Sequence, residues 1–169
     1  MTAPPNTPSL PLLFLDIDGP LLPFGATGYP TYEPADASNP LLARLNPAYG
    51  PRLLALPCEL VWATTWMSDA NACIAPRLGL PPLPVLDWPE PHAEDERTGL
   101  HWKTRALVAW AAGRPFAWVD DEITPRDRTW ISTHHPTRTL LHHVDPRRGL
   151  TPTDFETLES WLLSGPSSA

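Results

Sequence analysis

The stretch LLFLDIDG, residues 12–19, places two acids and a glycine directly after an apolar run. A short run of consecutive apolar residues is typical of a parallel strand that is buried on both faces. Asp16 and Asp18 flank one residue, so an extended backbone projects both carboxylates to the same side, and Gly19 lets the chain turn. One carboxylate can then serve as a nucleophile and the other as a proton-transfer group. A strand followed by a plain Asp-Gly turn fits a pattern of this kind equally well.

Apolar runs alternate with amphipathic segments along the rest of the chain. Strands are expected at residues 12–15, 59–63, 83–86, 116–119 and 139–144. Helices are expected over 40–56 with an interruption at 46–51, over 67–78, 101–112 and 125–132, and after Thr151, whereas the acidic segment 87–99 is expected to be irregular. This order predicts an α/β three-layer sandwich, with a five-stranded, mainly parallel, Rossmann-like sheet and helices on both faces.

The length of 169 residues suits a single domain with one ordinary core. Residues 1–10 are polar and rich in proline, and we expect them to be a flexible lead-in to a domain that spans residues 11–165. The expected strands and helices fill the gap after Gly19 and the gap between Thr64 and Lys103. No large cap domain fits in either gap, so we expect an open active site.

The composition narrows the class of protein. The formal charge is −7, from 12 basic and 19 acidic residues, which argues against binding a long nucleic acid but does not exclude a short oligonucleotide or a nucleotide end. The apolar stretches are too short for a membrane span, and the N-terminus has no signal-peptide pattern. Two cysteines are too few for a disulfide framework. A cytoplasmic location is the simplest interpretation.

Two threonines, Thr64 and Thr65, follow the second expected strand. A hydroxyl at the end of a buried strand can hydrogen-bond a phosphoryl oxygen, and the N-terminus of a following helix adds a favourable dipole. Helix capping is the plainer interpretation of either residue.

Lys103 is the only lysine, since the other eleven basic residues are arginines. It lies near the start of the helix expected over 101–112. From there its ammonium group can reach over the strand ends and neutralise both a carboxylate and a bound phosphate. A residue that opens a helix need not be buried, so we expect Lys103 to be replaceable without loss of the fold. A solvated lysine on a helix surface is the alternative.

Three consecutive acids, Asp120, Asp121 and Glu122, follow the apolar run 116–119. Adjacent carboxylates repel one another, and a divalent cation relieves that repulsion. Mg²⁺ prefers oxygen ligands from a few carboxylates, completed by waters and substrate phosphate. The alternative is a turn with acids that cap a helix.

Together these motifs resemble the haloacid-dehalogenase-like (HAD) hydrolase superfamily. The order is DxD after the first strand, threonine after the second, lysine at a helix start and an acidic pair after the next strand, and the resemblance covers roughly residues 12–122. It implies phosphomonoester hydrolysis with Mg²⁺ as the cofactor. Dehalogenases of the superfamily need no metal and lack the second aspartate. Asp18 and the acidic pair therefore favour phosphate chemistry.

The resemblance also implies a role for each matching residue. Asp16 would be the nucleophile that forms an aspartyl-phosphate, and Asp18 the general acid/base. Thr64 would bind the phosphoryl group, and Lys103 would steady the nucleophile and the phosphate. The implied magnesium ligands are the carboxylates of Asp16, Asp120 and Asp121 and the backbone carbonyl of Asp18.

The strings LVWATTW, HWKT, WVDDE and DPRRGLT more narrowly resemble small bacterial members of the superfamily. Those members are grouped with the HAD domains of "Swiss Army Knife" RNA repair proteins. The first hypothesis is a Mg²⁺-dependent phosphomonoester hydrolase, minimally capped, whose substrate the sequence does not identify. One alternative is a nucleic-acid-end or nucleotide phosphatase linked to RNA repair, and another is a non-catalytic module that binds a phosphorylated ligand or a protein.

The expected partners follow from these hypotheses. They are a phosphorylated small molecule or a nucleic-acid end, and they include neither a membrane nor a long nucleic acid. Trp66 and Trp102 lie next to site residues in the sequence, so either can line the pocket or stack on a planar ring.

Overall fold

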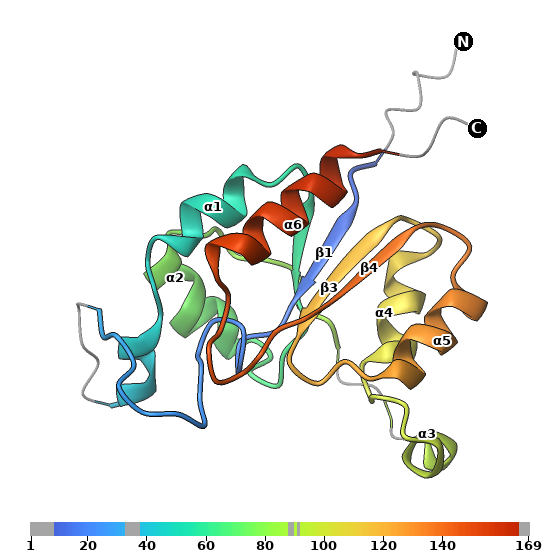
Figure 1. Ribbon diagram of the computed structural model, residues 1–169, viewed down its shortest axis with the longest axis horizontal. Coiled ribbons are helices and arrows are strands. Elements are labelled where there is room, and N and C mark those ends of the chain that lie inside the picture. The colour runs from blue at the N-terminus through green and yellow to red at the C-terminus, as the bar shows by residue number, and fades with distance from the viewer. Residues whose placement is uncertain (1–8, 33–37, 88–89, 91, 166–169) are drawn as a thin grey trace.

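The computed structural model describes residues 9–32, 38–87, 90 and 92–165. Its centre is a sheet of four strands in the order β2-β1-β3-β4, and every neighbouring pair is parallel. The strands are β1 (Leu12–Leu15), β2 (Glu59–Trp62), β3 (Phe116–Asp120) and β4 (Thr139–His143). The expected α/β class and parallel pairing are therefore confirmed (Figure 1).

The prediction of five strands is wrong, because residues 83–86 do not form a full strand. They contribute one isolated parallel bridge, between Val85 and Trp62. The Trp62 N–H donates to the Pro84 carbonyl over 2.9 Å, and the Leu86 N–H donates to the Trp62 carbonyl over 2.8 Å. Prolines at 81, 82 and 84 have no N–H to extend this ladder. Leu86 is buried and Leu83 and Val85 are half-buried, but the segment does not pair regularly with the sheet.

Helices cover both faces of the sheet, as predicted. Figure 1 shows α1, α2 and α6 on one face and α4 and α5 on the other, with α3 below α4 and α5 in this view. The helices are α1 (Tyr49–Ala55), α2 (Ala75–Leu78), α3 (Ala93–Thr98), α4 (Thr104–Ala111), α5 (Pro125–His134) and α6 (Pro152–Leu163), with a 3₁₀ turn η1 (Pro40–Arg44) and a π turn η2 (Ala70–Ile74). In the described part of the chain no separate cap domain is present.

The alternation of side chains along β1 divides the core into two layers. Leu13 and Leu15 pack with apolar residues of α1, α2 and α6. Leu12 and Phe14 pack with those of α4 and α5. Successive residues of a strand point to opposite faces, so a run of four buried residues is what a sheet covered on both sides requires.

Three helical segments differ from the sequence-based expectation. The segment 40–56 divides into η1 and α1, and the helix expected over 67–78 begins only at Ala70 and contains the π turn. The acidic segment 87–99, expected to be irregular, contains α3, whose first turn carries three acids that favour a helix N-terminus. The expected lead-in falls mostly on residues 1–8, which lie outside the described residues.

Capping boxes begin the two helices that follow β3 and β4. The hydroxyl of Thr151 accepts from the Asp154 N–H, while the Asp154 carboxylate accepts from the Thr151 N–H over 2.7 Å. Thr124 and Asp127 repeat this arrangement at α5. Each box satisfies donors that a helix start otherwise leaves without partners.

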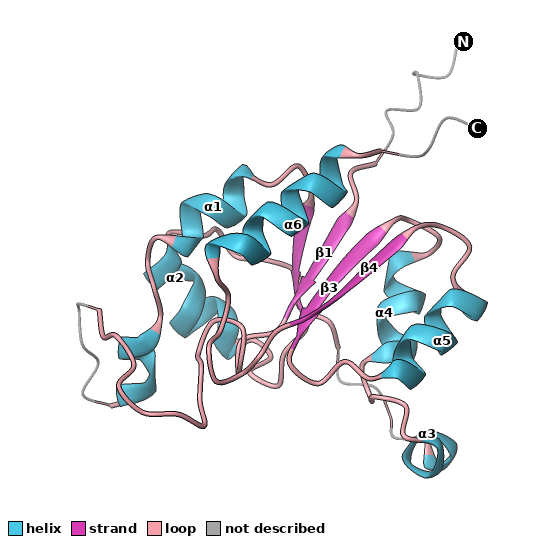
Figure 2. Cartoon of the chain, in the orientation of Figure 1, coloured by secondary structure: helices cyan, strands magenta, loops and turns pink. Residues whose placement is uncertain are grey.

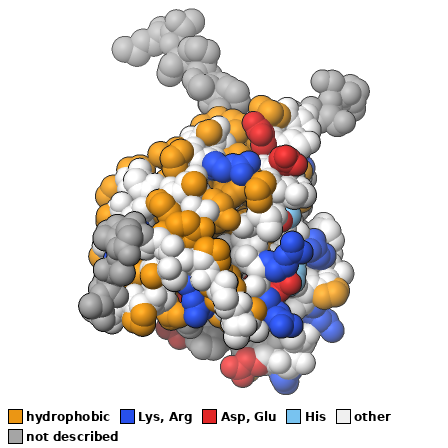
Figure 3. All heavy atoms as spheres, turned by 60° about the vertical axis from the view of Figure 1, so that its left-hand side comes forward, with side chains coloured by type: hydrophobic (Ala, Val, Ile, Leu, Met, Phe, Trp, Pro, Cys, Tyr) orange, Lys and Arg blue, Asp and Glu red, His pale blue; other side chains and the backbone are white. Residues whose placement is uncertain are grey.

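The surface is uneven in character. In Figure 3, apolar side chains make up much of the face that carries the left-hand elements of Figure 1, and charged side chains lie mainly toward its margins. Apolar atoms make up a large share of the surface of folded proteins in general, so this face by itself points to no function. Among the residues that the structure describes, no helix is long and apolar enough to cross a membrane.

Candidate active site

The predicted site residues meet at the carboxyl ends of β1 and β3. Asp16 directly follows β1, and Asp120 is the last residue of β3. The strand order places β2 on one side of β1 and β3 on the other, so the chain changes direction at β1, the place where open α/β sheets bind ligands. Figure 2 shows the loops that gather at this end of the sheet.

Lys103 lies between two carboxylates. Its Nζ is 2.7 Å from Asp120 Oδ2 and 3.3 Å from Asp16 Oδ1. The expectation that this lysine need not be buried is wrong, since only 2% of it is exposed. It precedes α4, whose start lies against the sheet edge, and its side chain reaches the ends of both strands.

Burial and mutual repulsion set the charge state of this cluster. Burial, opposed by Lys103 and reinforced by Asp120, raises the pKa of Asp16 from 3.8 to about 8. Burial and Asp120 raise the pKa of Asp121 to about 6. Burial alone would lower the pKa of Lys103, but Asp16 and Asp120 outweigh it and raise that pKa. The protein alone therefore leaves a deficit of positive charge at this edge.

The two adjacent aspartates have different surroundings. Asp120 is fully buried, and its carboxylate accepts from Lys103 Nζ, from the Trp118 indole over 3.1 Å and from the Glu122 N–H over 2.9 Å. Asp121 is half-buried and lines the hollow in front of the strand ends. Asp16, Asp120 and Asp121 each offer an oxygen within 4.8 Å of the others, close enough for one ion to bind all three.

Gly19 allows Asp121 to approach the first motif. Its φ is +97°, and a Cβ added there would lie 2.7 Å from the Asp121 Cγ. The glycine is required both for the backbone conformation and for the space. The sequence indicated a turn at this residue but not this contact.

Asp18 is half-buried and faces the same hollow. The indole N–H of Trp66 donates to Asp18 Oδ2 over 3.1 Å. Burial raises the pKa of the Asp18 carboxyl, against the opposing effects of that hydrogen bond and of Lys103. A raised pKa brings a carboxyl group closer to the range useful for a general acid.

The two threonines after β2 take different positions. Thr64 is buried, and its hydroxyl accepts from the Trp66 N–H over 3.2 Å. Thr65 is exposed and lines the hollow. The assignment of phosphoryl binding to Thr64 stays a prediction, and Thr65 is a second hydroxyl at the same place.

Sequence reasoning missed the contacts that fix the start of α4. The Asp127 Oδ1 accepts from the His101 N–H over 2.8 Å and from the Thr104 hydroxyl over 2.7 Å. The His101 Nδ1 accepts from the Lys103 N–H over 3.1 Å, and its Nε2 lies 2.9 Å from Glu122 Oε2. These contacts tie α4 to α5 and to the end of β3, and so hold Lys103 in place.

The hollow in front of the strand ends has a volume of about 150 Å³. It has room for a phosphoryl group but not for a nucleoside as well, since this is the volume of about five liquid waters. Trp102 lines it, as does Phe24, which is 45% exposed and which the sequence did not indicate. The full lining is Asp16, Asp18, Phe24, Thr65, Trp102, Lys103, Asp121 and Glu122.

A parallel sheet with an aspartate after the inner strand β1, a buried lysine and an acidic pair after β3 has the features of a HAD-like hydrolase domain. The chain belongs to the family described as the HAD domain in Swiss Army Knife RNA repair proteins, whose model matches residues 12–155. No curated protein and no solved structure matches the chain.

Proposed function

We propose that this protein is a Mg²⁺-dependent phosphomonoester hydrolase that forms an aspartyl-phosphate on Asp16. The observation that carries the proposal is Lys103, buried between Asp16 and Asp120 at the carboxyl edge of the sheet. Burying a lysine between two acids in front of a small open hollow suits a site that receives a dianion. Membership of a HAD family supports the same chemistry.

The acidic cluster fits a magnesium ion. Asp16 and Asp121 would hold it directly, with the backbone carbonyl of Asp18, and Asp120 would brace the site through Lys103. Burial first, and the neighbouring acids after it, raise the pKa values of Asp16 and Asp121, and a bound cation would oppose that shift by favouring the charged carboxylates. Bound Mg²⁺ supplies charge that offsets the repulsion between a carboxylate and a phosphate dianion.

In the first step, Asp16 attacks phosphorus. The Ile17 N–H and Lys103 hold its Oδ1, over 2.9 Å and 3.3 Å, and we assign the attack to Oδ2. A bond forms between this oxygen and phosphorus as the bond from phosphorus to the leaving oxygen breaks. Asp18 gives its proton to the leaving oxygen, which departs as an alcohol.

In the second step, water releases the phosphate. Asp18, now ionised, takes a proton from a water molecule whose oxygen attacks phosphorus. The bond between Asp16 and phosphorus breaks, and the carboxylate is restored. The hydrogen bond from Trp66 holds Asp18 in place for both proton transfers.

Metal removal tests the proposal directly. Hydrolysis of p-nitrophenyl phosphate is expected to stop in excess EDTA and to return when Mg²⁺ is added beyond the chelator, because charge at the reacting phosphate is lost and restored. Circular dichroism in EDTA serves as the control for folding. Undiminished hydrolysis in EDTA contradicts the proposal.

Replacement of Gly19 tests the position of Asp121. In Gly19→Ala the added methyl group would meet the Asp121 carboxyl carbon, so the carboxylate must move. We expect the Mg²⁺ concentration for half-maximal activity to rise by about tenfold or more, which is the loss of metal affinity typical when a residue that orients a metal ligand is changed. Gly28→Ala is the matched control, since its φ is also positive and nothing lies within 4 Å of its added Cβ. An unchanged Mg²⁺ requirement in Gly19→Ala argues against Asp121 as a ligand.

A nucleic-acid-end phosphatase is the second candidate. The family description names RNA repair proteins, and the small hollow leaves most of a large substrate outside it. Phe24 and Trp102 at its rim offer flat surfaces to a base or sugar beyond the phosphate. This candidate predicts a lower KM for phosphorylated oligonucleotides than for p-nitrophenyl phosphate.

A further inference from the structure

A second and larger hollow lies between α3, α4 and α5, with a volume of about 580 Å³. That volume is within the range of sites that hold small organic ligands. It shares no lining residue with the hollow that contains Asp16. None of the catalytic steps proposed above uses it.

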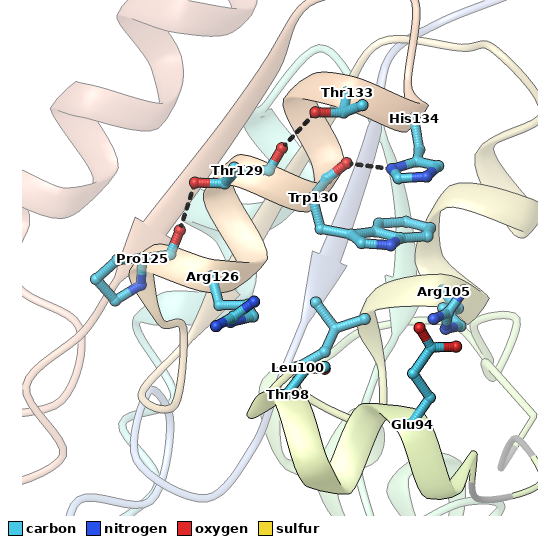
Figure 4. Close-up of a pocket in the computed structure, with 10 residues that line it drawn as sticks. All are labelled: Glu94, Thr98, Leu100, Arg105, Pro125, Arg126, Thr129, Trp130, Thr133 and His134. Atoms are coloured by element: carbon cyan, nitrogen blue, oxygen red, sulfur yellow. Dashed lines mark hydrogen bonds between the residues drawn. The ribbon is translucent and has the colours of Figure 1, made fainter.

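One face of α5 provides most of the lining. Arg126, Trp130 and His134 recur at intervals of four residues, so they lie on the same side of the helix. Figure 4 shows the Trp130 indole and the His134 imidazole lying parallel. Their ring centroids are 4.0 Å apart at an interplanar angle of 11°. This pair gives the hollow an aromatic surface.

The lining is more basic than the protein as a whole. It contains Arg105 and Arg126 against one acid, Glu94, with the imidazole of His134 beside them, in a chain whose formal charge of −7 counts histidine as neutral. Asp95 fixes the guanidinium of Arg105 through contacts of 2.7–2.9 Å, and that guanidinium lies 5.1 Å from the Trp130 centroid. The guanidinium of Arg126 has no hydrogen bond or ion pair to another residue in the part of the chain that the structure describes. It is therefore available to an anionic ligand.

Hydroxyl oxygens complete the lining. Thr129 and Thr133 on α5 donate to the carbonyls of Pro125 and Thr129, which leaves their oxygens able to accept. With the Glu94 carboxylate they offer acceptors to sugar hydroxyls or base amino groups. Cations, an aromatic surface and acceptors together suit phosphate, base and ribose.

The two hollows are close along the chain. Lys103 lines the first and Arg105 the second, and two residues span at most about 7 Å. Glu122 and Pro125 are related in the same way across three residues, at most about 11 Å. His101, whose Nε2 lies 2.9 Å from Glu122 Oε2, comes in the chain between Leu100 of the second hollow and Trp102 of the first. A single-stranded nucleic acid whose end lies in the hollow that contains Asp16 can therefore reach the hollow between α3, α4 and α5.

We infer that the hollow between α3, α4 and α5 binds a single-stranded RNA segment next to the phosphate that is hydrolysed. The identity of this occupant rests on the proposed function. Arg126 pairs with a backbone phosphate, and a base stacks on the outer face of His134, because the Trp130 indole lies between that imidazole and the Arg105 guanidinium. The hollow thereby selects a nucleic-acid end over a small phosphomonoester.

Fluorescence anisotropy with an unphosphorylated, fluorescein-labelled octauridylate tests the inference without any turnover. The wild type is expected to bind it saturably. Arg126→Ala and Trp130→Leu are each expected to raise the Kd by about fivefold or more, the scale of losing one stacking or charged contact. Arg97→Ala is the matched control, because Arg97 is an exposed arginine of α3 outside the lining. It is expected to stay within about twofold of the wild type.

Salt dependence separates the two roles. One phosphate contact contributes about −0.7 to the slope of log K against log salt for a single strand. Arg126→Ala is expected to lose that contribution, while Trp130→Leu keeps the wild-type slope, since stacking is uncharged. Crosslinks from a 4-thiouridine oligonucleotide are expected to map to α5.

Four outcomes decide the matter. Loss of binding in Arg126→Ala with retention in Arg97→Ala supports the inference. A wild type that does not bind the oligonucleotide, or equal losses in both arginine variants, overturns it. Hydrolysis of p-nitrophenyl phosphate by the same preparation is measured in parallel. If the wild type binds RNA but hydrolyses nothing, the proposed function fails while the RNA site stands.

Discussion

Asp16→Asn is expected to lower turnover by about 10⁴-fold or more, the scale of removing a nucleophile from an enzyme. The amide cannot attack phosphorus, and no covalent intermediate can form on it. Hydrolysis of p-nitrophenyl phosphate and intact-mass spectrometry after a rapid quench measure the two losses. Asparagine has nearly the same shape, so the hydrogen bond from the Ile17 N–H is kept.

Unfolding should not explain this loss. Burial and the nearby acids raise the pKa of Asp16, which means that its charge costs stability in the metal-free fold. The metal-free Asp16→Asn variant is therefore expected to melt at or above the wild-type temperature. Stabilisation with loss of activity is the pattern expected of a functional residue in a strained site. A lower melting temperature contradicts this account of the charge.

Asp18→Asn is the internal comparison for Asp16. It leaves the nucleophile but removes the proton donor, so turnover is expected to fall by about 10²–10⁴-fold, the range for general acid–base catalysis. The loss should be smaller with p-nitrophenyl phosphate, whose leaving group barely needs protonation. The phosphoenzyme should then accumulate, because no base activates water. An adduct on a residue other than Asp16, or equal losses in both variants for every leaving group, overturns the assignment of roles.

The residues at the strand ends were predictable from the sequence because their positions depend on local order. An apolar run followed by DxDG predicts a carboxylate pair at the edge of a parallel sheet, and the structure places Asp16 and Asp18 there. In the same way, the apolar run 116–119 predicts that Asp120 and Asp121 lie at the end of a parallel strand, and Asp120 is the last residue of β3. Parallel strands end at one edge, so two such runs predict one cluster.

The contacts between distant elements were not predictable in this way. The burial of Lys103 depends on how α4 meets β3, which Asp127 and Glu122 fix from other parts of the chain through their contacts with His101. Only the capping pattern of Thr124 and Asp127 carried a local signal for this arrangement. The absence of regular pairing at residues 83–86 was predictable from the sequence, because the prolines at 81, 82 and 84 oppose the pairing that the apolar pattern favours.

Lys103→Met is expected to damage both activity and stability. Turnover should fall by about 10²-fold or more, the scale of losing one preorganised charge at the reacting group. The free energy of unfolding should fall by about 3–5 kcal/mol, since removing one partner of a buried ion pair leaves the charge of the other uncompensated. Chemical denaturation followed by tryptophan fluorescence measures the second effect, in EDTA so that metal does not intervene.

The dependence of stability on pH tests whether the charge of Asp16 destabilises the metal-free fold. The pKa of Asp16 is about 8 in the fold against 3.8 for an unperturbed aspartate, so between these values the folded state holds a proton that the unfolded chain has released. The stability of the metal-free wild type should therefore fall as pH rises from about 4 and level off above about 8. Lys103 lowers the pKa of Asp16. In Lys103→Met the pKa of Asp16 should therefore be higher still, and the stability should go on falling to a higher pH than in the wild type.

A double variant separates catalysis by Lys103 from its structural role. In Lys103→Met/Asp120→Asn the closest partner of the lysine is also neutral, so the double variant should recover about 0.5–3 kcal/mol of the lost stability, as coupled residues of one network do. Turnover should stay low, because no ammonium faces Asp16 or the phosphate. If activity returns together with stability, Lys103 only holds the fold, and the charge for the transition state must come from elsewhere.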